Sequence, residues 1–412
     1  MIGTIVIVGG GIAGVSTAAA LRSAGFAGDL TLVDAGEFPY DRPPLSKDFL
    51  LGNKTRADLA LQPPRWYDDN KVRLINHTRV TAIRPDLGGI ELADSAFLGA
   101  DRVVLATGGQ AGRLPVSGLD SPRVHVLRTV DDAERLRDAL TNLACAQRVL
   151  VVGAGLIGAE AASTAVDLGC EVVLADPVGP PLTAAVGVEL AEWLHSRHTA
   201  RGIRTVPAAI GAVHDTGDAV HAEIPGFASC AGFDAVVLGV GMVPDTALAE
   251  AAGLETDRGI VIDPGRTTSN PAVLAVGDAT RIRRDGVLQP RTEHWEAARH
   301  DGSAAAATLL GHALPDEPVP WFWTDRHRLH VEVVGEMRAA RHTVVRGDLG
   351  KPPFAVFGLT DDRVVAAAGV DHPTAVRAAR RLISSGTTVD SAHLADTTTD
   401  LRALLRGRPA AR

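Results

Sequence analysis

Two glycine-rich turns carry the residues of this chain with the clearest chemical meaning. They read Gly9-Gly10-Gly11-Ile12-Ala13-Gly14 and Gly153-Ala154-Gly155-Leu156-Ile157-Gly158. In such a turn the first glycine allows a tight bend, the second lets the backbone approach a pyrophosphate, and the third lets a helix pack on a strand. The free N–H groups at the start of that helix favour the phosphate charge. The sequence therefore predicts that one chain holds two dinucleotides.

An aspartate follows each turn at a position suited to a ribose. Asp34 and Asp176 each end an apolar run, about 20 residues past their turn, where an acidic side chain hydrogen-bonds ribose hydroxyls. A carboxylate at Asp176 also repels a 2′-phosphate, and residues 177–180 offer no arginine to neutralise one. The second site is therefore expected to prefer a dinucleotide that lacks a 2′-phosphate.

The elements that must position these turns repeat in the same order. A β-branched run at residues 4–8 precedes the first turn, and its helix is expected to end near Gly25; residues 148–152 precede the second, and its helix is expected to end at Gly169. Short alternating strands from about Trp321 indicate a different architecture. The predicted fold class is α/β, with two Rossmann-like dinucleotide-binding domains and a C-terminal α+β domain.

The repeats also suggest domain boundaries. The first dinucleotide unit is expected to be discontinuous, over residues 1–112 and 245–320, with a probable strand at residues 80–83. The second is expected over residues 113–244 and the C-terminal domain over residues 321–412. A chain of 412 residues exceeds the usual size of one hydrophobic core, which agrees with several domains.

Composition and cysteine spacing exclude several other kinds of protein. Cys145, Cys170 and Cys230 are far apart and form no CxxC or CxxxxC pair, so a dithiol that relays electrons is not expected, nor is a metal site. A net charge of −8 argues against nucleic-acid binding, and no apolar stretch is long enough for a membrane anchor. Because the first strand begins almost at Met1, we expect no secretion signal and a cytoplasmic enzyme.

Several further blocks carry a family resemblance that spans nearly the whole chain. They are Arg42-Pro43-Pro44-Leu45-Ser46-Lys47, Ala106-Thr107-Gly108, Leu127-Arg128-Thr129, Val276-Gly277-Asp278, Arg291-Thr292-Glu293-His294-Trp295 and Trp321-Phe322-Trp323-Thr324-Asp325. With the doubled turns, the chain resembles the FAD-dependent, NADH-using ferredoxin reductases that serve bacterial monooxygenases and dioxygenases. Thiol-dependent relatives would carry their cysteines near residues 39–47, where this chain has none.

The resemblance implies FAD in the first unit and NADH in the second. Arg42 would add charge at the FAD phosphates, Val80 would pair its backbone with adenine, and Arg128 would reach back to the flavin nucleotide. Asp278 would bind the ribityl chain and Trp295 the far edge of the flavin. The residues implied for FAD are Gly9, Gly11, Ala13, Gly14, Asp34, Arg42, Lys47, Val80, Ala106, Thr107, Gly108, Arg128, Asp278 and Trp295. Those implied for NADH are Gly153, Gly155, Leu156, Ile157, Gly158, Glu160, Asp176, Gly239 and Gly241.

Lys47 and Glu160 are the pair that the resemblance assigns to catalysis. It implies that both lie beside the isoalloxazine, with the lysine near the reactive central-ring nitrogen. A buried ammonium paired with a carboxylate would provide a fixed field that stabilises the negative charge of reduced flavin. Glu160 lies among Ala159, Ala161 and Ala162, a setting that suits a buried carboxylate better than a surface one.

The implied electron acceptor is an iron-sulfur ferredoxin of the two-iron or three-iron type, which feeds a cytochrome monooxygenase or a ring-hydroxylating dioxygenase. Without a dithiol, a reduced flavin must release its electrons, one at a time, to an outside acceptor. Trp295 and Trp323 are candidates to shield the flavin face. The segment after Trp323 departs from the family pattern, so the docking contacts stay open, with five arginines as candidates: Arg326, Arg328, Arg338, Arg341 and Arg346.

Two other functions agree with the same residues. One is an NADH oxidase or peroxidase, or a rubredoxin reductase, although no active-site cysteine of the usual oxidase kind is present. The other is an NADH-sensing flavoprotein that resembles apoptosis-inducing factor and binds partners according to its redox state. Fold-level analogy alone does not separate these possibilities.

Overall fold

The computed structural model describes residues 2–141, 147–227 and 232–404 of the chain. It divides into two units, each with its own set of internal contacts. Unit 1 contains Met1–Arg42, Lys54–Gln110 and Met242–Pro318, and unit 2 contains Pro43–Asn53, Ala111–Gly241 and Val319–Arg412. The fold class expected from the sequence is confirmed in both units.

Unit 1 is built on a five-stranded parallel sheet in the order β18-β7-β1-β2-β3. The strands are β1 (Thr4–Val8), β2 (Asp29–Val33), β3 (Val72–Ile75), β7 (Arg102–Leu105) and β18 (Val273–Ala275). β1 reads TIVIV, and such a β-branched run, buried on both faces, is typical of a central parallel strand. Val8 lies opposite both Val33 and Leu105, so three strands end at one edge of the sheet, directly before the first glycine turn.

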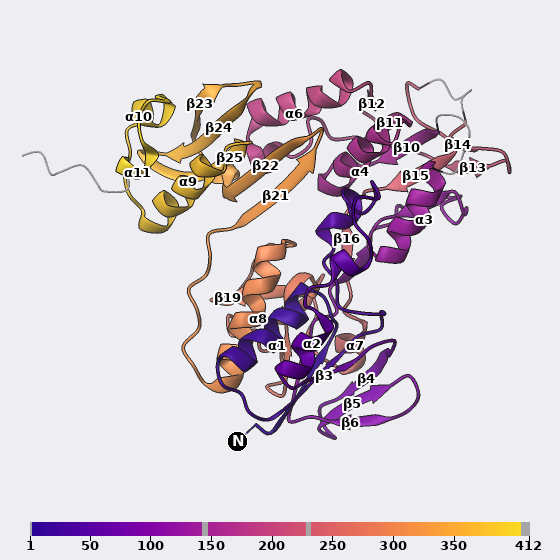
Figure 1. Ribbon diagram of the computed structural model, residues 1–412, viewed down its shortest axis with the longest axis vertical. Coiled ribbons are helices and arrows are strands. Elements are labelled where there is room, and N and C mark those ends of the chain that lie inside the picture. The colour runs from indigo at the N-terminus through magenta and orange to yellow at the C-terminus, as the bar shows by residue number, and fades with distance from the viewer. Residues whose placement is uncertain (1, 142–146, 228–231, 405–412) are drawn as a thin grey trace, which may run out of the picture. The chain divides into compact units, whose positions relative to one another are not determined.

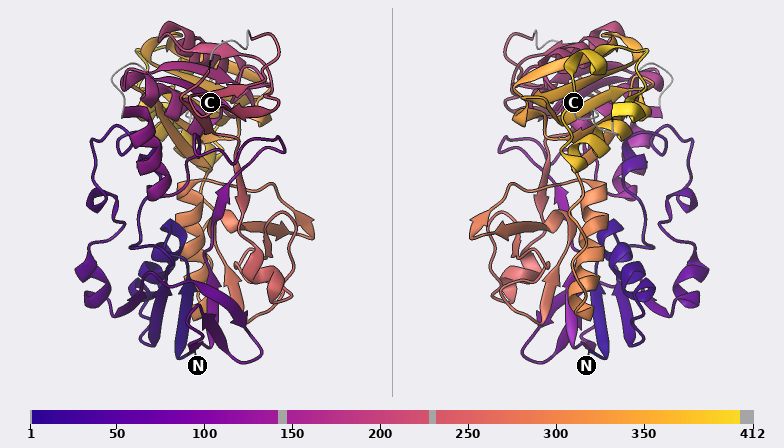
Figure 2. Two further views of the ribbon diagram at one scale, coloured as in Figure 1. Left: turned by 90° about the vertical axis from the view of Figure 1, so that its right-hand side faces the viewer. Right: turned by 90° about the vertical axis from the view of Figure 1, so that its left-hand side faces the viewer.

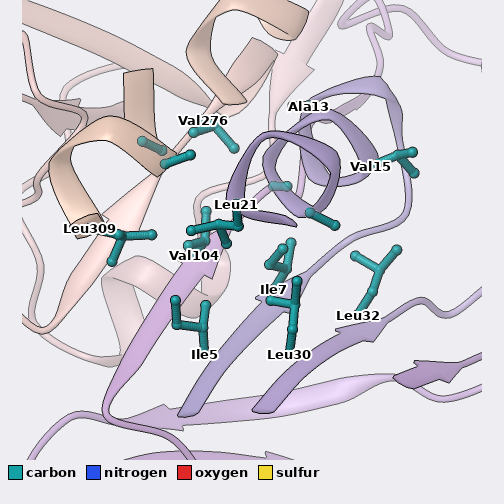
Figure 3. Packing of buried hydrophobic residues seen from close by; sticks show 14 of the residues in the cluster. Ile5, Ile7, Ala13, Val15, Leu21, Leu30, Leu32, Val104, Val276 and Leu309 are labelled. Carbon is teal, nitrogen blue, oxygen red and sulfur yellow. The ribbon is translucent and has the colours of Figure 1, made fainter. Parts of the chain in front are cut away.

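Helices α1 (Ile12–Ser23) and α8 (Trp295–Leu310) pack together on one face of this sheet, although they come from distant parts of the chain (Figures 1 and 2). Gly302 permits this close approach, because a Cβ there would lie 2.6 Å from the backbone N of Thr17. Side chains of α1, α8 and the central strands, among them Ile5, Leu21 and Leu309, form the buried core between the layers (Figure 3).

The remaining elements of unit 1 include two small sheets. A second core lines the other face of the central sheet, with buried residues from β4, β5 and β17. The further elements are η2 (Ala57–Leu59), α2 (Pro64–Asp69), β4 (Val80–Arg84), β5 (Gly89–Leu92), β6 (Phe97–Gly99), β16 (Met242–Pro244), α7 (Ala247–Ala251), β17 (Ile260–Ile262), η3 (Gly277–Ala279), β19 (Thr280–Arg284) and β20 (Val287–Leu288). The strand predicted at residues 80–83 is therefore confirmed as part of β4.

Unit 2 repeats the parallel sheet, in the order β12-β11-β10-β15-β9. Val152 at the end of β10 lies opposite Ala175 of β11 and Leu238 of β15, which is the register of the first sheet again. The elements are η1 (Pro43–Ser46), β9 (Val124–Val126), α3 (Val130–Thr141), β10 (Arg148–Val152), α4 (Leu156–Asp167), β11 (Glu171–Ala175), α5 (Thr183–Val186), α6 (Val188–Ala200), β12 (Arg204–Val206), β13 (Val213–Asp215), β14 (Val220–Ala222) and β15 (Ala235–Leu238). β8 (Gly109–Ala111) spans the point where the chain passes from unit 1 to unit 2.

Unit 2 also contains a five-stranded antiparallel sheet, in the order β21-β22-β25-β24-β23 (Figure 1). Leu382 of the amphipathic helix α9 belongs to the core on one face, and Leu190 and Leu194 of α6 to the core on the other. This second group ties the antiparallel sheet to the dinucleotide-binding part of unit 2. The elements are β21 (Trp321–Arg326), β22 (Leu329–Gly335), η4 (Met337–Ala339), β23 (His342–Asp348), β24 (Lys351–Thr360), β25 (Arg363–Val370), α9 (Pro373–Ser385), α10 (Ser391–Ala395) and α11 (Leu401–Leu404).

Candidate functional site

The first glycine turn is closed at its two ends and open in the middle. Gly9 has a φ of +111°, and a Cβ there would lie 2.3 Å from the carbonyl oxygen of Ala106. A Cβ on Gly14 would lie 2.0 Å from the carbonyl oxygen of Gly9. A Cβ on Gly11, in contrast, would meet no atom within 4 Å. Only the middle glycine faces space that a ligand can fill.

The second turn has the same geometry in unit 2. Gly153 has a φ of +93°, and its Cβ would lie 2.5 Å from the carbonyl oxygen of Gly239, while a Cβ on Gly158 would lie 1.8 Å from that of Gly153. Nothing lies within 4 Å of the position that a Cβ on Gly155 would take. Gly239 is itself required by packing, because its Cβ would lie 2.8 Å from the Cα of Gly158. Two independent turns therefore leave the same opening.

Both aspartates that follow the turns are held by matching hydrogen bonds. Asp34 accepts from the backbone N of Gly10 and, at 2.7 Å, from that of Gly36. Asp176 accepts from the backbone N of Ala154 at 2.7 Å and from that of Val178 at 2.8 Å. Each carboxylate is thus fixed beside the turn, where a ribose next to a bound pyrophosphate would lie.

The helices after the turns complete each dinucleotide cradle. Gly11 and Gly155 are the N-caps of α1 and α4, and neither helix has a side-chain hydrogen bond at its cap or an acidic residue in its first turn. The positive ends of both helices therefore lie at the open middle glycines, where they favour a bound anion. The residues present fit one pyrophosphate with its ribose in unit 1 and another in unit 2.

Other residues predicted for the first dinucleotide lie in loops at the ends of unit 1 strands or beside α8. Thr107 follows β7 and donates its hydroxyl to the carbonyl oxygen of Asp245 at 2.7 Å. The Trp295 indole begins α8 and donates to Asp41 at 2.8 Å. The Arg42 guanidinium lies 5.8 Å from the centre of the Tyr40 ring. Val80 is buried at the start of β4.

Asp278 lies on the short helix η3, and a buried ion pair fixes this turn. The backbone N of Gly277 donates to Asp301 at 2.9 Å, and Asp301 pairs with Arg266 at 2.9 Å. Arg266 also bonds Glu317 at 3.1 Å. Sequence reasoning missed this support, because the three partners are separated in the chain and belong to no motif.

Two predicted residues of unit 2 lie in loops at the ends of strands. Arg128 lies between β9 and α3, and its backbone N donates to Asp132 at 3.2 Å. Gly241 follows β15 with a φ of +93°, a conformation that favours glycine, and a Cβ there would meet nothing within 4 Å.

Lys47 and Glu160 do meet inside unit 2, on η1 and α4 respectively. The Lys47 ammonium lies 3.4 Å from one Glu160 carboxylate oxygen, and their side chains are 13% and 5% exposed. Ser46 also donates to Glu160, Thr324 donates to it at 2.8 Å, and the backbone N of Asp325 donates at 3.1 Å. With four donors around it, the charge of this buried carboxylate is compensated. The surface alternative for Glu160 is wrong.

Asp325 and His330 are members of this network that sequence reasoning missed. Asp325 binds the Lys47 ammonium at 2.6 Å, closer than Glu160 does, and bonds the His330 ring at 2.5 Å. Burial raises the pKa of Asp325, but the hydrogen bonds from Lys47 and His330 outweigh it and hold the pKa below its usual value. The only available signal in the sequence was that Asp325 ends the block Trp321-Phe322-Trp323-Thr324-Asp325, which does not give the partners of its side chain.

A buried histidine pair lies next to this network. The His327 ring is hydrogen-bonded to the His198 ring at 2.9 Å, and both residues are buried. Burial lowers the pKa of His327 to about 4, and the positive charge of nearby Arg326 adds to this effect. Burial lowers the pKa of His198 to about 2, with smaller contributions from His327 and Arg326. Both rings are therefore neutral near neutral pH.

The predicted docking role is wrong for two of the five candidate arginines. Arg326 is buried beside the histidine pair, and Arg346 is buried with its guanidinium on the carbonyl oxygens of Leu394, Asp396, Thr397 and Thr399. Neither can face a partner protein. Arg328, Arg338 and Arg341 are exposed and remain candidates.

Cys170 is buried and free, and burial raises the pKa of its thiol to about 11. It hydrogen-bonds the Leu140 carbonyl oxygen at 3.8 Å, as a structural cysteine does. Cys145 and Cys230 lie outside the described residues. Within the described ranges, no cluster of His, Cys, Asp and Glu could hold a metal ion. No helix among them is long and apolar enough to cross a membrane.

Comparisons with known proteins cover almost the entire chain. Residues 3–302 match a family described as pyridine nucleotide-disulphide oxidoreductase, and residues 321–405 match a family described as reductase C-terminal. The chain is 38% identical to the ferredoxin–NAD(+) reductase component of the anthranilate 1,2-dioxygenase system of Burkholderia cepacia, over 97% of this chain and 98% of that protein. It is 35% identical to putidaredoxin reductase of Pseudomonas putida, over 97% and 96%.

Solved structures agree with these sequence matches. The reductase in the covalent putidaredoxin reductase–putidaredoxin complex has a TM-score of 0.90 and 33% identity, and the match covers 98% of each chain. The ferredoxin reductase of the CYP199A2 system from Rhodopseudomonas palustris has a TM-score of 0.91 and 30% identity, over 97% of this chain and 99% of that one.

Proposed function

Because this chain belongs to the pyridine nucleotide-disulphide oxidoreductase family, we propose that it is the FAD-dependent NADH:ferredoxin reductase of an oxygenase system. It takes a hydride from NADH and passes electrons singly to an iron-sulfur ferredoxin, which feeds a cytochrome monooxygenase or a ring-hydroxylating dioxygenase. Relatives that carry the names of such reductases support this assignment over 97–98% of the chain.

The doubled dinucleotide cradle is the observation that carries the proposal. Each cradle has an open middle glycine, a helix N-terminus and a fixed aspartate, and a reductase that joins two dinucleotides needs both. Bound nicotinamide supplies a hydride, and bound flavin accepts two electrons and can release them one at a time. We assign FAD to residues 1–112 and 245–320 and NADH to residues 113–244, with residues 321–412 as the C-terminal α+β domain.

We propose that Lys47 and Glu160 are the charged pair that acts on the bound flavin. The Lys47 ammonium is almost buried and has carboxylates on two sides, so its position is fixed before any substrate binds. A fixed cation costs no reorganisation when negative charge develops nearby. Glu160, which pairs with that cation, is itself held by hydrogen bonds from Ser46 of η1 and Thr324 of β21.

Replacing Lys47 by alanine tests this role. The variant removes the fixed cation that would stabilise negative charge on the flavin. We therefore expect NADH to reduce the flavin at least ~10-fold more slowly at saturating NADH. Lys351→Ala removes an exposed cation elsewhere in unit 2 and should leave the rate unchanged. An FAD-loaded Lys47→Ala protein with the rate of the natural one would remove Lys47 from the mechanism.

Rapid mixing decides between ferredoxin reductase and the other candidate functions. The enzyme is reduced anaerobically with NADH and then mixed with a two-iron ferredoxin, a three-iron ferredoxin, a rubredoxin or oxygen. We expect fast reoxidation by one of the ferredoxins and slow reoxidation by oxygen. Fast turnover with oxygen would identify an oxidase, fast turnover with rubredoxin alone a rubredoxin reductase, and stable reduced enzyme with every acceptor a redox sensor.

We place the enzyme in the cytoplasm, where NADH is produced and consumed. Fractionation of cells that express the protein tests this location, because reductase activity should follow a cytoplasmic marker. Activity in the membrane or secreted fraction would contradict it.

A further inference from the structure

A closed set of contacts in unit 1 supports the turn that carries Asp278. One carboxylate oxygen of Asp301, on α8, accepts from the backbone N of Gly277 at 2.9 Å, and the other accepts from the Arg266 guanidinium at 2.9 Å. The carbonyl oxygen of Arg266 in turn accepts from the backbone N of Ala275 at 3.0 Å. Ala275 is the last residue of β18, directly before the turn. The contacts therefore begin and end on the same short segment of chain.

Arg266 is fixed on every side of this set. Its side chain is buried, and the guanidinium also donates to Glu317 at 3.1 Å and to the carbonyl oxygen of Pro264. Its φ of +69° lies in the left-handed region, which an arginine adopts only where surrounding contacts require it. One of these contacts is the hydrogen bond from its backbone N to the carbonyl oxygen of Asp263 at 2.9 Å. The partner of Asp301 therefore has a defined position before any cofactor binds.

The supported turn lies against the first dinucleotide cradle. A Cβ on Gly277 would lie 2.9 Å from the Cβ of Ala13, in the first turn of α1, and 3.6 Å from the Cβ of Ala298 on α8. Val276, directly before the turn, belongs with Ala13 to the buried core between the central sheet and the two helices (Figure 3). Asp278, directly after Gly277, therefore lies beside the helix N-terminus that is assigned to the pyrophosphate. A ribityl chain attached to that pyrophosphate begins at this place.

We propose that Asp301 and Arg266 are positioning residues for FAD, which hold the turn at Gly277 so that Asp278 meets the ribityl hydroxyl groups. The inference rests on the proposed function, because it requires FAD in unit 1 with its ribityl chain at Asp278. The two positioning residues act on the affinity for FAD through Asp278, without contact with the cofactor. Their effect on FAD binding therefore depends on the presence of the Asp278 carboxylate.

The double role of Asp301 requires a carboxylate. Its two oxygens accept from two different partners, the guanidinium of Arg266 and the backbone N of Gly277. Burial raises the pKa of this carboxyl, and the contacts with Arg266 and Gly277 oppose that rise. Asparagine has a single acceptor oxygen, and its NH₂ group can accept from neither partner. Asp301→Asn must therefore lose either the hold on Gly277 or the bond that fixes the side chain to Arg266.

A double-mutant cycle on the affinity for FAD tests the positioning role. The holoenzyme is diluted, and the fluorescence of the released FAD gives the dissociation constant. We expect Asp301→Asn to weaken FAD binding at least ~10-fold, the effect of one lost hydrogen bond to a charged group. In an Asp278→Ala background the same substitution should change the dissociation constant less than about twofold, because the side chain that Asp301 positions is gone.

Two control variants separate positioning from loss of charge and from loss of stability. Glu255→Gln also converts a carboxylate to an amide, in an exposed ion pair of unit 1 with Arg283 at 2.6 Å, and should leave the affinity for FAD unchanged. Leu309→Ala removes buried packing from α8, the helix that carries Asp301. It should lower the free energy of unfolding, measured with urea, while the folded protein binds FAD as the natural one does.

Two results would overturn the inference. One is an unchanged dissociation constant for FAD in folded Asp301→Asn; the other is an equal loss of affinity with and without Asp278, which a purely structural role would give. If Asp301→Asn does not fold, Arg266→Lys replaces it in the same cycle, because lysine keeps the buried positive charge but lacks the planar fork of the guanidinium. Failure of the proposed function has a different signature, since a protein that binds FAD and reduces no ferredoxin still gives the predicted cycle.

Discussion

The second glycine turn yields a prediction in which affinity and stability separate. In Gly155→Ala the added Cβ meets nothing within 4 Å, and the φ of −64° suits alanine. The free energy of unfolding should therefore fall by less than about 1 kcal/mol, the usual cost of alanine at a helix N-cap. The same methyl group occupies the space into which a pyrophosphate must come to reach the backbone.

Gly158→Ala should behave differently, because its Cβ would lie 1.8 Å from the carbonyl oxygen of Gly153. The tightest ordinary contact of a Cβ is 3.4 Å, so backbone must move by about 1.6 Å, the difference of the two distances. Overpacking of this kind costs about 1–3 kcal/mol. Gly158→Ala is therefore expected to lose both stability and cofactor affinity.

The affinity loss in Gly155→Ala can be estimated from the hydrogen bonds at stake. One charge-assisted hydrogen bond between backbone and phosphate contributes about 1.5–3 kcal/mol, which corresponds to about 10- to 150-fold weaker binding of NAD⁺. Calorimetric titration with NAD⁺ measures the affinity, and urea unfolding measures the stability. Gly99→Ala is the matched control, because it adds a methyl group at an exposed position of β6 with its nearest neighbour at 3.9 Å.

The refuting results are specific. A Gly155→Ala protein that binds NAD⁺ as the natural protein does would show that the open middle glycine is not the phosphate contact. A Gly158→Ala protein of unchanged stability would show that the third glycine is not required by packing. Loss of stability in Gly155→Ala equal to that in Gly158→Ala would remove the distinction between the two positions.

Two further predictions concern the histidine pair and Asp176. Because burial lowers the pKa of His198 and His327 to about 2 and about 4, the unfolded imidazoles, with pKa near 6.5, bind protons that the folded ones do not. The free energy of unfolding should be highest above about pH 6.5 and should fall as the pH decreases, by about 2 kcal/mol per histidine at pH 5. The two losses should not be additive, because the rings share a hydrogen bond. Urea unfolding from pH 5 to 8 measures this dependence. The free energy of unfolding should depend less on pH in His327→Asn, a variant chosen because asparagine tolerates the positive φ, and equal pH dependence in both proteins would contradict the prediction. For Asp176, steady-state kinetics should show a preference for NADH that falls at least ~10-fold in Asp176→Ser, and an unchanged ratio would assign selectivity to another residue.

Local pattern was sufficient to predict the dinucleotide-binding fold. β-branched runs before each glycine turn, and glycines where the helices end, give the sheet and helix order without knowledge of distant contacts. α1 ends at Ser23 and α4 at Asp167, two residues before Gly25 and Gly169, both of which adopt positive φ. The glycine geometry then follows from the strand register on either side.

The Lys47 network could be predicted only in part, because it depends on tertiary packing. Glu160 was identified through the resemblance and its apolar neighbours. Asp325, which bonds His330, becomes a partner of Lys47 only when the β21–β22 hairpin packs beside α4. The docking role predicted for two of the five arginines was wrong for the same reason. Arginine is usually exposed, so the sequence favours a surface position for Arg326 and Arg346, and only the fold shows that both are buried.

Anaerobic titration of the purified protein with NADH tests the central claim most directly. If the two cradles hold FAD and NADH as proposed, the protein is yellow, contains one FAD per chain, and loses its flavin absorbance with one equivalent of NADH, after which an iron-sulfur ferredoxin restores it. A colourless protein that cannot be reconstituted with FAD, or a bound flavin that NADH does not reduce, would contradict the account.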